Sequence, residues 1–155
     1  MKVLGIDPGA ISGAYAYWDT IRGAVFVGDI PVADKNVNAA ELNRILDIYR
    51  PDVAIIERVG AMPKQGVSSV FSFGRGVGRI EGVIAASELC AEFVTPQVWK
   101  RHFKLPGGPK NKELSRVKAI QLFPGATGLS RKMDAGRAEA LLIAKWFVET
   151  HGARA

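Results

Sequence analysis

The sequence is poor in the residues that build covalent cross-links and zinc sites. Its 155 residues include one cysteine, Cys90, and only two histidines. A single cysteine cannot form an intrachain disulfide, and structural zinc sites take four cysteine or histidine ligands. We therefore expect a protein of a reducing, cytoplasmic compartment whose chemistry does not depend on thiolate or imidazole ligands.

Long apolar runs are also missing. No stretch approaches the roughly 20 continuous apolar residues that a membrane-spanning helix needs. Asp7 interrupts the apolar stretch at the N-terminus within a few residues, and no small-residue cleavage site of a signal peptide follows it. The sequence thus predicts a soluble protein with no membrane partner.

Acidic residues are outnumbered by basic ones. Fifteen Asp and Glu face twenty-one Lys and Arg, which gives a formal charge of +6, and the pI is about 9.7. Such a balance favours a polyanionic partner such as nucleic acid, although a basic surface that only keeps the protein soluble remains an alternative. A chain of this length, 48% hydrophobic, predicts one domain over residues 1–155.

Alternating and continuous apolar patterns predict three strands, then a helix, a strand, a helix, a strand and further helices. Two tight turns join the first three strands into an antiparallel meander. The fourth strand is an almost continuous apolar run, typical of a strand buried on both faces. The expected strands are 2–7, 14–19, 23–30, 51–57 and 91–96, and the expected helices are 38–50, 67–88, one starting at 96, 112–125 and 135–150.

Carboxylates occur where these apolar elements end or begin. Asp7 ends the first strand, Glu57 ends the fourth, and Asp134 and Glu139 lie around the start of the last helix. A buried carboxylate costs several kcal/mol unless a cation meets it. If the first and fourth strands are neighbours, an oxygen-rich cluster forms, which suits Mg²⁺ or Mn²⁺. A turn cap or an ordinary salt bridge is the alternative for any one of these acids.

A glycine-rich stretch marks the helix expected over 67–88. Gly74, Gly78 and Gly82 are four residues apart and form one smooth stripe. The stripe is explained either by close packing on the sheet or by a subunit seam or a surface that a ligand approaches.

Aromatic and basic side chains in the same segment are candidates for DNA contacts. Phe71 and Phe73 lie beside Arg75 and Arg79 and could stack on unpaired bases, with core packing as the alternative. Other basic residues follow the fifth strand or flank the last acids, and we expect them to contact phosphates, so that binding weakens with salt. They are Lys100, Arg101, Lys104, Lys110, Lys112, Arg131, Lys132 and Arg137.

Five motifs in this order resemble the RuvC-type Holliday junction resolvases, in particular the short forms of phages and prophages. They are "GIDPG", "AIIERV", "VFSFGRGVGRIEG", "TPQVWKRHF" and "DAGRAEALLIA", and the resemblance extends from Val3 to Trp146. It implies an α/β, RNase H-like fold with a mixed five-stranded sheet, three strands antiparallel and then parallel ones, flanked by helices.

The resemblance also implies an activity and a set of ligands. Asp7 and Glu57 match the first two metal ligands of the family, and Glu139 matches its last acid. It further implies two Mg²⁺ ions per site, with Mn²⁺ as a possible substitute, and paired symmetric nicks in four-way DNA junctions in a bacterial cell or a phage-infected host. The glycine-rich helix would join two subunits into a homodimer.

Asp134 departs from the family pattern. The family places its two C-terminal acids three or four residues apart, whereas Asp134 and Glu139 are five apart, about 140° around a regular helix. Both acids can reach one site only if Asp134 precedes the helix proper, and Gly136 is compatible with such an irregular start. We therefore keep both as candidate catalytic and metal-binding residues.

Three other functions are alternatives to junction resolution. A less selective branched-DNA nuclease of the same fold would carry the same acids, and a junction-binding protein without catalysis would not need them. A sugar kinase with a similar Asp-x-Gly turn is disfavoured, because 155 residues cannot supply its two duplicated domains.

Overall fold

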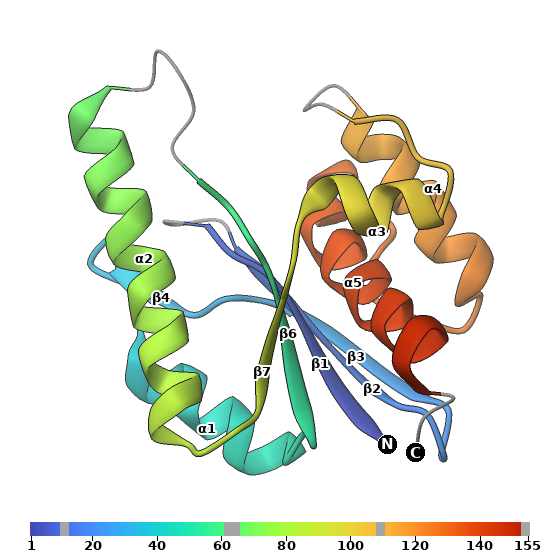
Figure 1. The fold of residues 1–155 in the computed structure, drawn as a ribbon, viewed down its shortest axis with the longest axis horizontal. Helices are drawn as coiled ribbons and strands as arrows, with labels where there is room; N and C mark the ends of the chain where they lie inside the picture. Colours follow the sequence, from blue (N-terminus) through green and yellow to red (C-terminus); the bar gives the residue numbers. More distant parts are fainter. Residues whose placement is uncertain (10–12, 61–65, 108–110, 153–155) are drawn as a thin grey trace.

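The structure is a computed structural model that describes residues 1–9, 13–60, 66–107 and 111–152. A five-stranded sheet in the order β3-β2-β1-β6-β7 forms its centre (Figure 1). The first three strands are antiparallel, and β6 and β7 continue the sheet in parallel with β1. Their bounds are Lys2–Asp7 for β1, Ala14–Asp19 for β2, Ala24–Asp29 for β3, Val53–Glu57 for β6 and Ala91–Val94 for β7. The mixed sheet expected from the sequence is thereby confirmed.

Helices cover both faces of this sheet. On one face lie α1 (Ala39–Tyr49) and α2 (Val67–Ala86), and on the other lie α3 (Pro96–His102), α4 (Lys112–Leu122) and α5 (Ala135–His151) (Figure 1). A 3₁₀ turn, Lys132–Asp134, directly precedes α5. Among the described residues, no helix is both long and apolar enough to cross a membrane.

Side chains alternate between two hydrophobic cores along β1. Leu4 and Ile6 point into a core that they share with α1 and α2, whereas Val3 belongs to the core formed with α3, α4 and α5. Both cores also take residues of β6, all five of which are buried. This two-sided burial explains why β6 reads as a continuous apolar run.

Gly5 lets α5 pack directly on the centre of the sheet. A Cβ atom at this position would collide with the carbonyl oxygen of Ala140 and would lie 2.9 Å from the amide nitrogen of Ala144. Only a residue without a side chain tolerates such an approach of backbone to backbone. The contact places the first turns of α5 beside the end of β1.

The glycine stripe of α2 does not pack on the sheet. A Cβ atom added at Gly74, Gly78 or Gly82 would meet nothing within 4 Å. This corrects the packing explanation offered for the stripe, because nothing in the described chain lies close against it. The stripe is an open surface of α2.

One local feature differs from the sequence-based expectation. A small hairpin of β4 (Val32–Ala33) and β5 (Asn36–Val37) precedes α1, and its turn residues Asp34 and Lys35 have φ of 49° and 59°. Thr95 occupies the N-cap position of α3, and its side chain makes no capping hydrogen bond.

Candidate active site

Two of the predicted acids end neighbouring parallel strands. Ile6 of β1 pairs with Ile56 of β6, so the residues that follow them, Asp7 and Glu57, leave the sheet at the same edge. Each side chain is only 8% exposed. The carboxyl ends of β1, β6 and β7 all point to the side of the molecule where α2 and α3 begin (Figure 1).

Glu139 joins these two acids from α5. It is 3% exposed. The pKa of Asp7 is raised from 3.8 to about 8, mainly by burial and then by the negative charges of Glu57 and Glu139, in that order. Burial is also the main reason that the pKa of Glu57 is raised, and the charge of Glu139 adds to it. Three carboxylates from β1, β6 and α5 are therefore close enough to oppose one another's ionisation.

Polar partners hold both glutamates. Trp99 Nε1 donates to Glu57 Oε1 at 2.8 Å, and Ser115 Oγ donates to Glu139 Oε1 at 3.0 Å. The ammonium groups of Lys100 and Lys112 lie 3.0 and 3.7 Å from the Oε1 and Oε2 atoms of Glu139. Sequence reasoning assigned both lysines to DNA and gave Trp99 and Ser115 no role, because each contact joins elements far apart in the chain.

The donor set fits a hard divalent cation in type. Every candidate ligand is a carboxylate oxygen, and the acids are buried side by side, where a cation between them would relieve their repulsion. Among the described residues, however, no three acidic, histidine or cysteine side chains converge closely enough to form a finished metal site. Lys100 and Lys112 hold Glu139 in this conformation, so an ion would have to replace at least one of these contacts.

Asp134 belongs to a different cluster. It lies in the 3₁₀ turn before α5, as its role as a ligand required, and is 1% exposed. Its carboxylate, however, accepts hydrogen bonds from the backbone and guanidinium of Arg131, at 2.8 and 2.7 Å, and Arg137 lies 3.5 Å away. Arg137 in turn forms a two-bond ion pair with Asp29 at the end of β3. These arginines lower the pKa of Asp134, with the bond from Arg131 as the largest cause.

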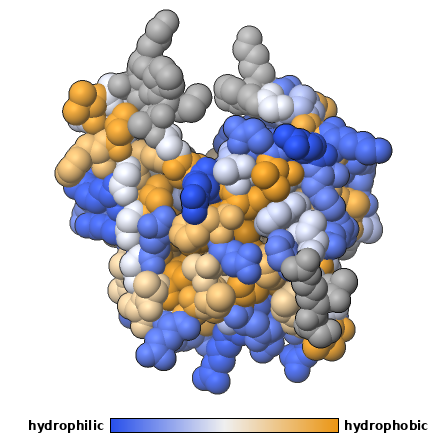
Figure 2. Space-filling view, viewed as in Figure 1, coloured by the Kyte–Doolittle hydropathy of each residue, from blue (hydrophilic) through white to orange (hydrophobic). Residues whose placement is uncertain are grey.

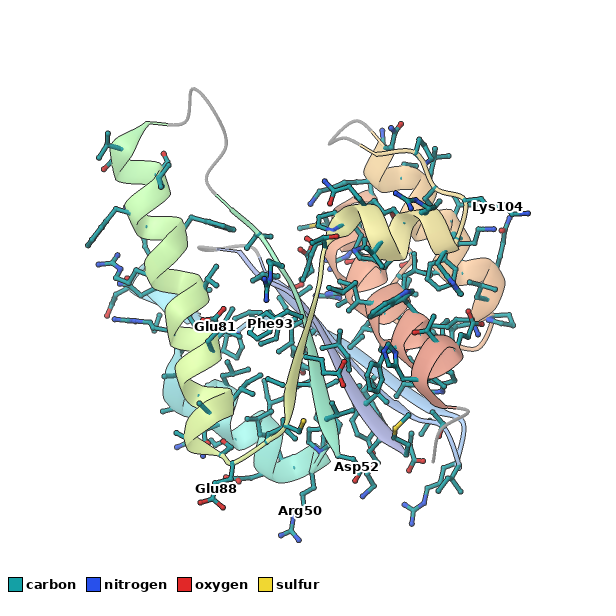
Figure 3. All side chains as sticks on the ribbon, in the orientation of Figure 1. Arg50, Asp52, Glu81, Glu88, Phe93 and Lys104 are labelled. Atoms are coloured by element: carbon teal, nitrogen blue, oxygen red, sulfur yellow. The ribbon has the colours of Figure 1, made fainter. Side chains whose placement is uncertain are left out.

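Three of the predicted basic residues line one pocket. Lys100, Arg101 and Lys104 surround a cavity of about 530 Å³. Its other walls are Pro96, Gln97, Leu105 and Gly107. None of the acids lines this cavity, but Lys100, which does, also contacts Glu139. Figure 3 shows Lys104 at the outer end of α3, directed away from the sheet.

The remaining predicted basic residues are dispersed. Arg131 and Arg137 are held in the Asp134 cluster, and Lys132 is exposed in the 3₁₀ turn. Lys110 lies outside the described residues. The structure thus joins Lys100 and Lys112 to the acids and separates them from Arg131 and Arg137, which the sequence placed beside the last acids.

The aromatic candidates lie on α2. Phe71 is 69% exposed, with the guanidinium of Arg75 5.8 Å from its ring centre. Phe73 is half-buried and lines a cavity of about 230 Å³ beside the open glycine stripe. Arg79 is exposed and donates a hydrogen bond to the carbonyl of Val37 at 2.9 Å. Of the two phenylalanines, Phe71 is therefore the more exposed, and neither belongs to a hydrophobic core of the described chain.

The ends of β1 and β6, where Asp7 and Glu57 lie, face a hollow in the surface. Figure 2 shows the molecule indented between the side that carries α2 and the side that carries α3 and α4. From β7, Phe93 is directed toward the α2 side of the sheet (Figure 3), and the guanidinium of Arg58 lies 5.3 Å from its ring centre. Phe93 and Arg58 thus form an exposed aromatic and cationic pair at the ends of β6 and β7.

The sheet order and the helices on its two faces define an RNase H-like fold. Several solved structures that resemble the chain over nearly its whole length are Holliday junction resolvases. RuvC from Thermus thermophilus, solved with a Holliday junction substrate, matches with a TM-score of 0.72 and 15% identity, covering 97% of both chains. The fowlpox virus resolvase matches with a TM-score of 0.61 and 15% identity, covering 97% of this chain and 99% of its own.

A third similar structure is the yeast mitochondrial Holliday junction resolvase. Its TM-score is 0.57 at 12% identity, over 93% of this chain and 78% of its own. The sequence matches no protein-family model and no curated protein. The similarity therefore establishes the fold of RuvC-type resolvases for this chain.

Proposed function

We propose that the chain is a divalent-metal-dependent endonuclease that resolves four-way DNA junctions by paired symmetric nicks, acting as a single nuclease domain. The observation that carries the proposal is that Asp7, Glu57 and Glu139 lie buried near one another at the ends of β1 and β6. Burial and the charges of the two glutamates raise the pKa of Asp7 there. Buried carboxylates that repel one another cost stability, and carboxylates with strongly shifted pKa values cluster at functional sites. Their presence beside a surface hollow therefore favours a catalytic role.

The three acids would hold two Mg²⁺ ions, or Mn²⁺ in their place. Bound ions of this kind supply an activated water and neutralise charge at a phosphodiester. The charges of both Glu57 and Glu139 act on Asp7 and raise its pKa, so Asp7 would be the central acid of this ligand set. We assign Asp134 to the structural cluster with Arg131, because that arginine already occupies both of its carboxylate oxygens.

DNA would approach over α3 and the hollow. The cavity lined by Lys100, Arg101 and Lys104 has the size and charge to take a backbone phosphate, and Lys100 links it to the acids. Phe71 is available to stack on a base that is unpaired at a branch point. The resolvases of similar fold, two of them solved with junction DNA, support branched DNA as the substrate.

A homodimer would explain two nicks. Val67 and Phe71 are exposed near the start of α2, and Gly74 and Gly78 of the open stripe line a cavity together with Val59, Val70, Phe73 and Val77. We propose that a second copy covers this face, which would set one active site against each of two strands. Sedimentation of the wild type and of Gly82→Leu tests the dimer, because a Cβ atom at Gly82 meets nothing within 4 Å in the described chain and Gly82 does not line the cavity, so the bulky residue would obstruct a partner.

Cleavage of labelled DNA tests the activity. The purified protein is incubated with a four-way junction, a fork and a linear duplex, with Mg²⁺ or with EDTA, and cut positions are mapped on each strand. We expect symmetric, Mg²⁺-dependent nicks in the junction alone and none from Asp7→Asn. Equal cutting of all three substrates would indicate a general branched-DNA nuclease, and tight binding without cutting would indicate a non-catalytic junction-binding protein.

A further inference from the structure

Trp99 is fully buried, yet its one polar atom contacts a predicted metal ligand. Its indole Nε1 lies 2.8 Å from Glu57 Oε1, across 42 residues of sequence. The next residue, Lys100, places its ammonium 5.0 Å from the centre of the Trp99 ring and 3.0 Å from Glu139 Oε1. One turn of α3 therefore reaches the glutamates of both β6 and α5.

The chemistry of an indole suits the support of a metal ligand. Its N–H donates a single hydrogen bond and carries no charge that would compete with a cation. The bond engages Oε1 and restricts the orientation of the carboxylate, while Oε2 takes no part in this bond. A lysine in the same place would neutralise the acid, as Lys100 does for Glu139.

Packing fixes the indole itself. Trp99 is 0% exposed and belongs to the core that α3, α4 and α5 share with the sheet. Every buried polar side-chain atom in the described part of the chain has a hydrogen-bond partner, and for Trp99 Nε1 this partner is Glu57. The donor is thus rigid, and the flexible member of the pair is the glutamate.

We infer that Trp99 is the positioning residue that orients Glu57 for a divalent cation. The inference rests on the proposed function, since it assumes that Glu57 is a ligand. Carboxylates that bind metals are usually held by such outer hydrogen bonds, whose loss typically weakens metal binding 10- to 100-fold.

Titration of the full chain with Mn²⁺ tests this role. In Trp99→Phe the ring remains and only the N–H is lost, and Trp146→Phe makes the same change on α5 away from the acids. We expect Mn²⁺ affinity by calorimetry to fall 10- to 100-fold in Trp99→Phe and to stay unchanged in Trp146→Phe. Unchanged affinity in Trp99→Phe would overturn the inference, including when urea unfolding shows lower stability, because that result describes a merely structural role.

The two proposals fail in different ways. A wild-type protein that binds neither Mn²⁺ nor Mg²⁺ would refute the proposed function, whereas wild-type binding that Trp99→Phe retains in full would refute only the role of Trp99.

A measurement on the wild-type chain covers the case in which Trp99→Phe does not fold. The chain has three tryptophans, so ¹⁵N-labelled protein gives three indole N–H signals, which Trp18→Phe and Trp146→Phe assign. We expect Mg²⁺ to shift the Trp99 signal and to leave the other two in place. A Trp99 signal that stays fixed when Mg²⁺ saturates the protein would overturn the inference.

Discussion

Replacement of Asp7 by asparagine should stabilise the metal-free protein. The Asp7 carboxyl ionises with an ordinary pKa of 3.8 and, after burial beside Glu57 and Glu139, with a pKa of about 8. At pH 7 this difference amounts to about 4 kcal/mol against the folded state, at 1.36 kcal/mol for each tenfold change in proton affinity. Relaxation of the site and entry of water reduce the effect, so we expect Asp7→Asn to gain about 1 to 3 kcal/mol.

The sign of this effect sets its pH dependence. A carboxyl whose folded pKa is raised costs nothing below its unfolded pKa, and the cost grows as the pH rises and is complete above the folded pKa. The gain in Asp7→Asn should therefore be small at pH 4, grow through pH 7 and level off above about pH 8. Urea unfolding in EDTA, followed by circular dichroism at several pH values, measures it.

A divalent cation should make the wild type more stable than Asp7→Asn, the reverse of their order in EDTA. Mg²⁺ that binds only the folded wild type raises its stability with concentration, whereas Asp7→Asn lacks one of the proposed ligands and should gain much less. Asp47→Asn, the same change at an exposed position of α1, is the control and should behave as the wild type in both conditions. The reasoning is refuted if Asp7→Asn is less stable than the wild type in EDTA, or if Mg²⁺ stabilises both equally.

Three further perturbations test other parts of the structure. Gly5→Ala should lower the free energy of unfolding by about 3 kcal/mol in urea titrations, because its Cβ would collide with the backbone of α5. Gly82→Ala, in open space, should raise the free energy of unfolding by about 0.5 to 1 kcal/mol. A Gly5→Ala variant as stable as the wild type would refute the contact. Asp134→Asn should cost about 1 to 3 kcal/mol at pH 7. Because the pKa of Asp134 is lowered, this difference should be complete above pH 3.8 and disappear as the pH falls further, and Mn²⁺ affinity should not change; a large loss of Mn²⁺ affinity would restore Asp134 as a ligand. Lys104→Ala should weaken junction binding and reduce the slope of log affinity against log salt by about 1, whereas Lys35→Ala on the β4–β5 turn should not; equal slopes would remove the cavity on α3 from the DNA path.

The apolar pattern was sufficient to predict the strands and to place Asp7 and Glu57 at the ends of two of them. Their proximity required these strands to be neighbours, and the parallel part of the sheet was implied by the resemblance to the RuvC-type resolvases. The β4–β5 hairpin was missed because strands of two residues have no periodicity to detect. The bonds from Trp99 and Ser115 were missed because they span 42 and 24 residues and depend on how α3 and α4 pack.

The contacts of Asp134 could not be predicted from its spacing in the sequence. The 3₁₀ turn does place it before α5, as a fourth ligand required. The direction of its side chain is decided by Arg131, three residues earlier, which donates through its backbone and its guanidinium. A short-range partner of opposite charge captures a carboxylate before a distant cluster of like charge can, since like charges oppose its approach. Spacing could limit where Asp134 lies but not what it binds.

Tight packing of α5 is what keeps the three repelling acids together. Ala138, Ala140 and the four residues 141–144 are fully buried around Glu139, and Gly5 brings this helix against β1. In a looser fold, a small outward shift of α5 would separate Glu139 from Asp7 and relieve the repulsion that raises the Asp7 pKa. Because close-packed interiors resist such shifts, the repulsion remains and can be relieved by protons, by Lys100 and Lys112, or by a metal ion. The cation affinity proposed for the site would in this sense be a property of the core beneath it.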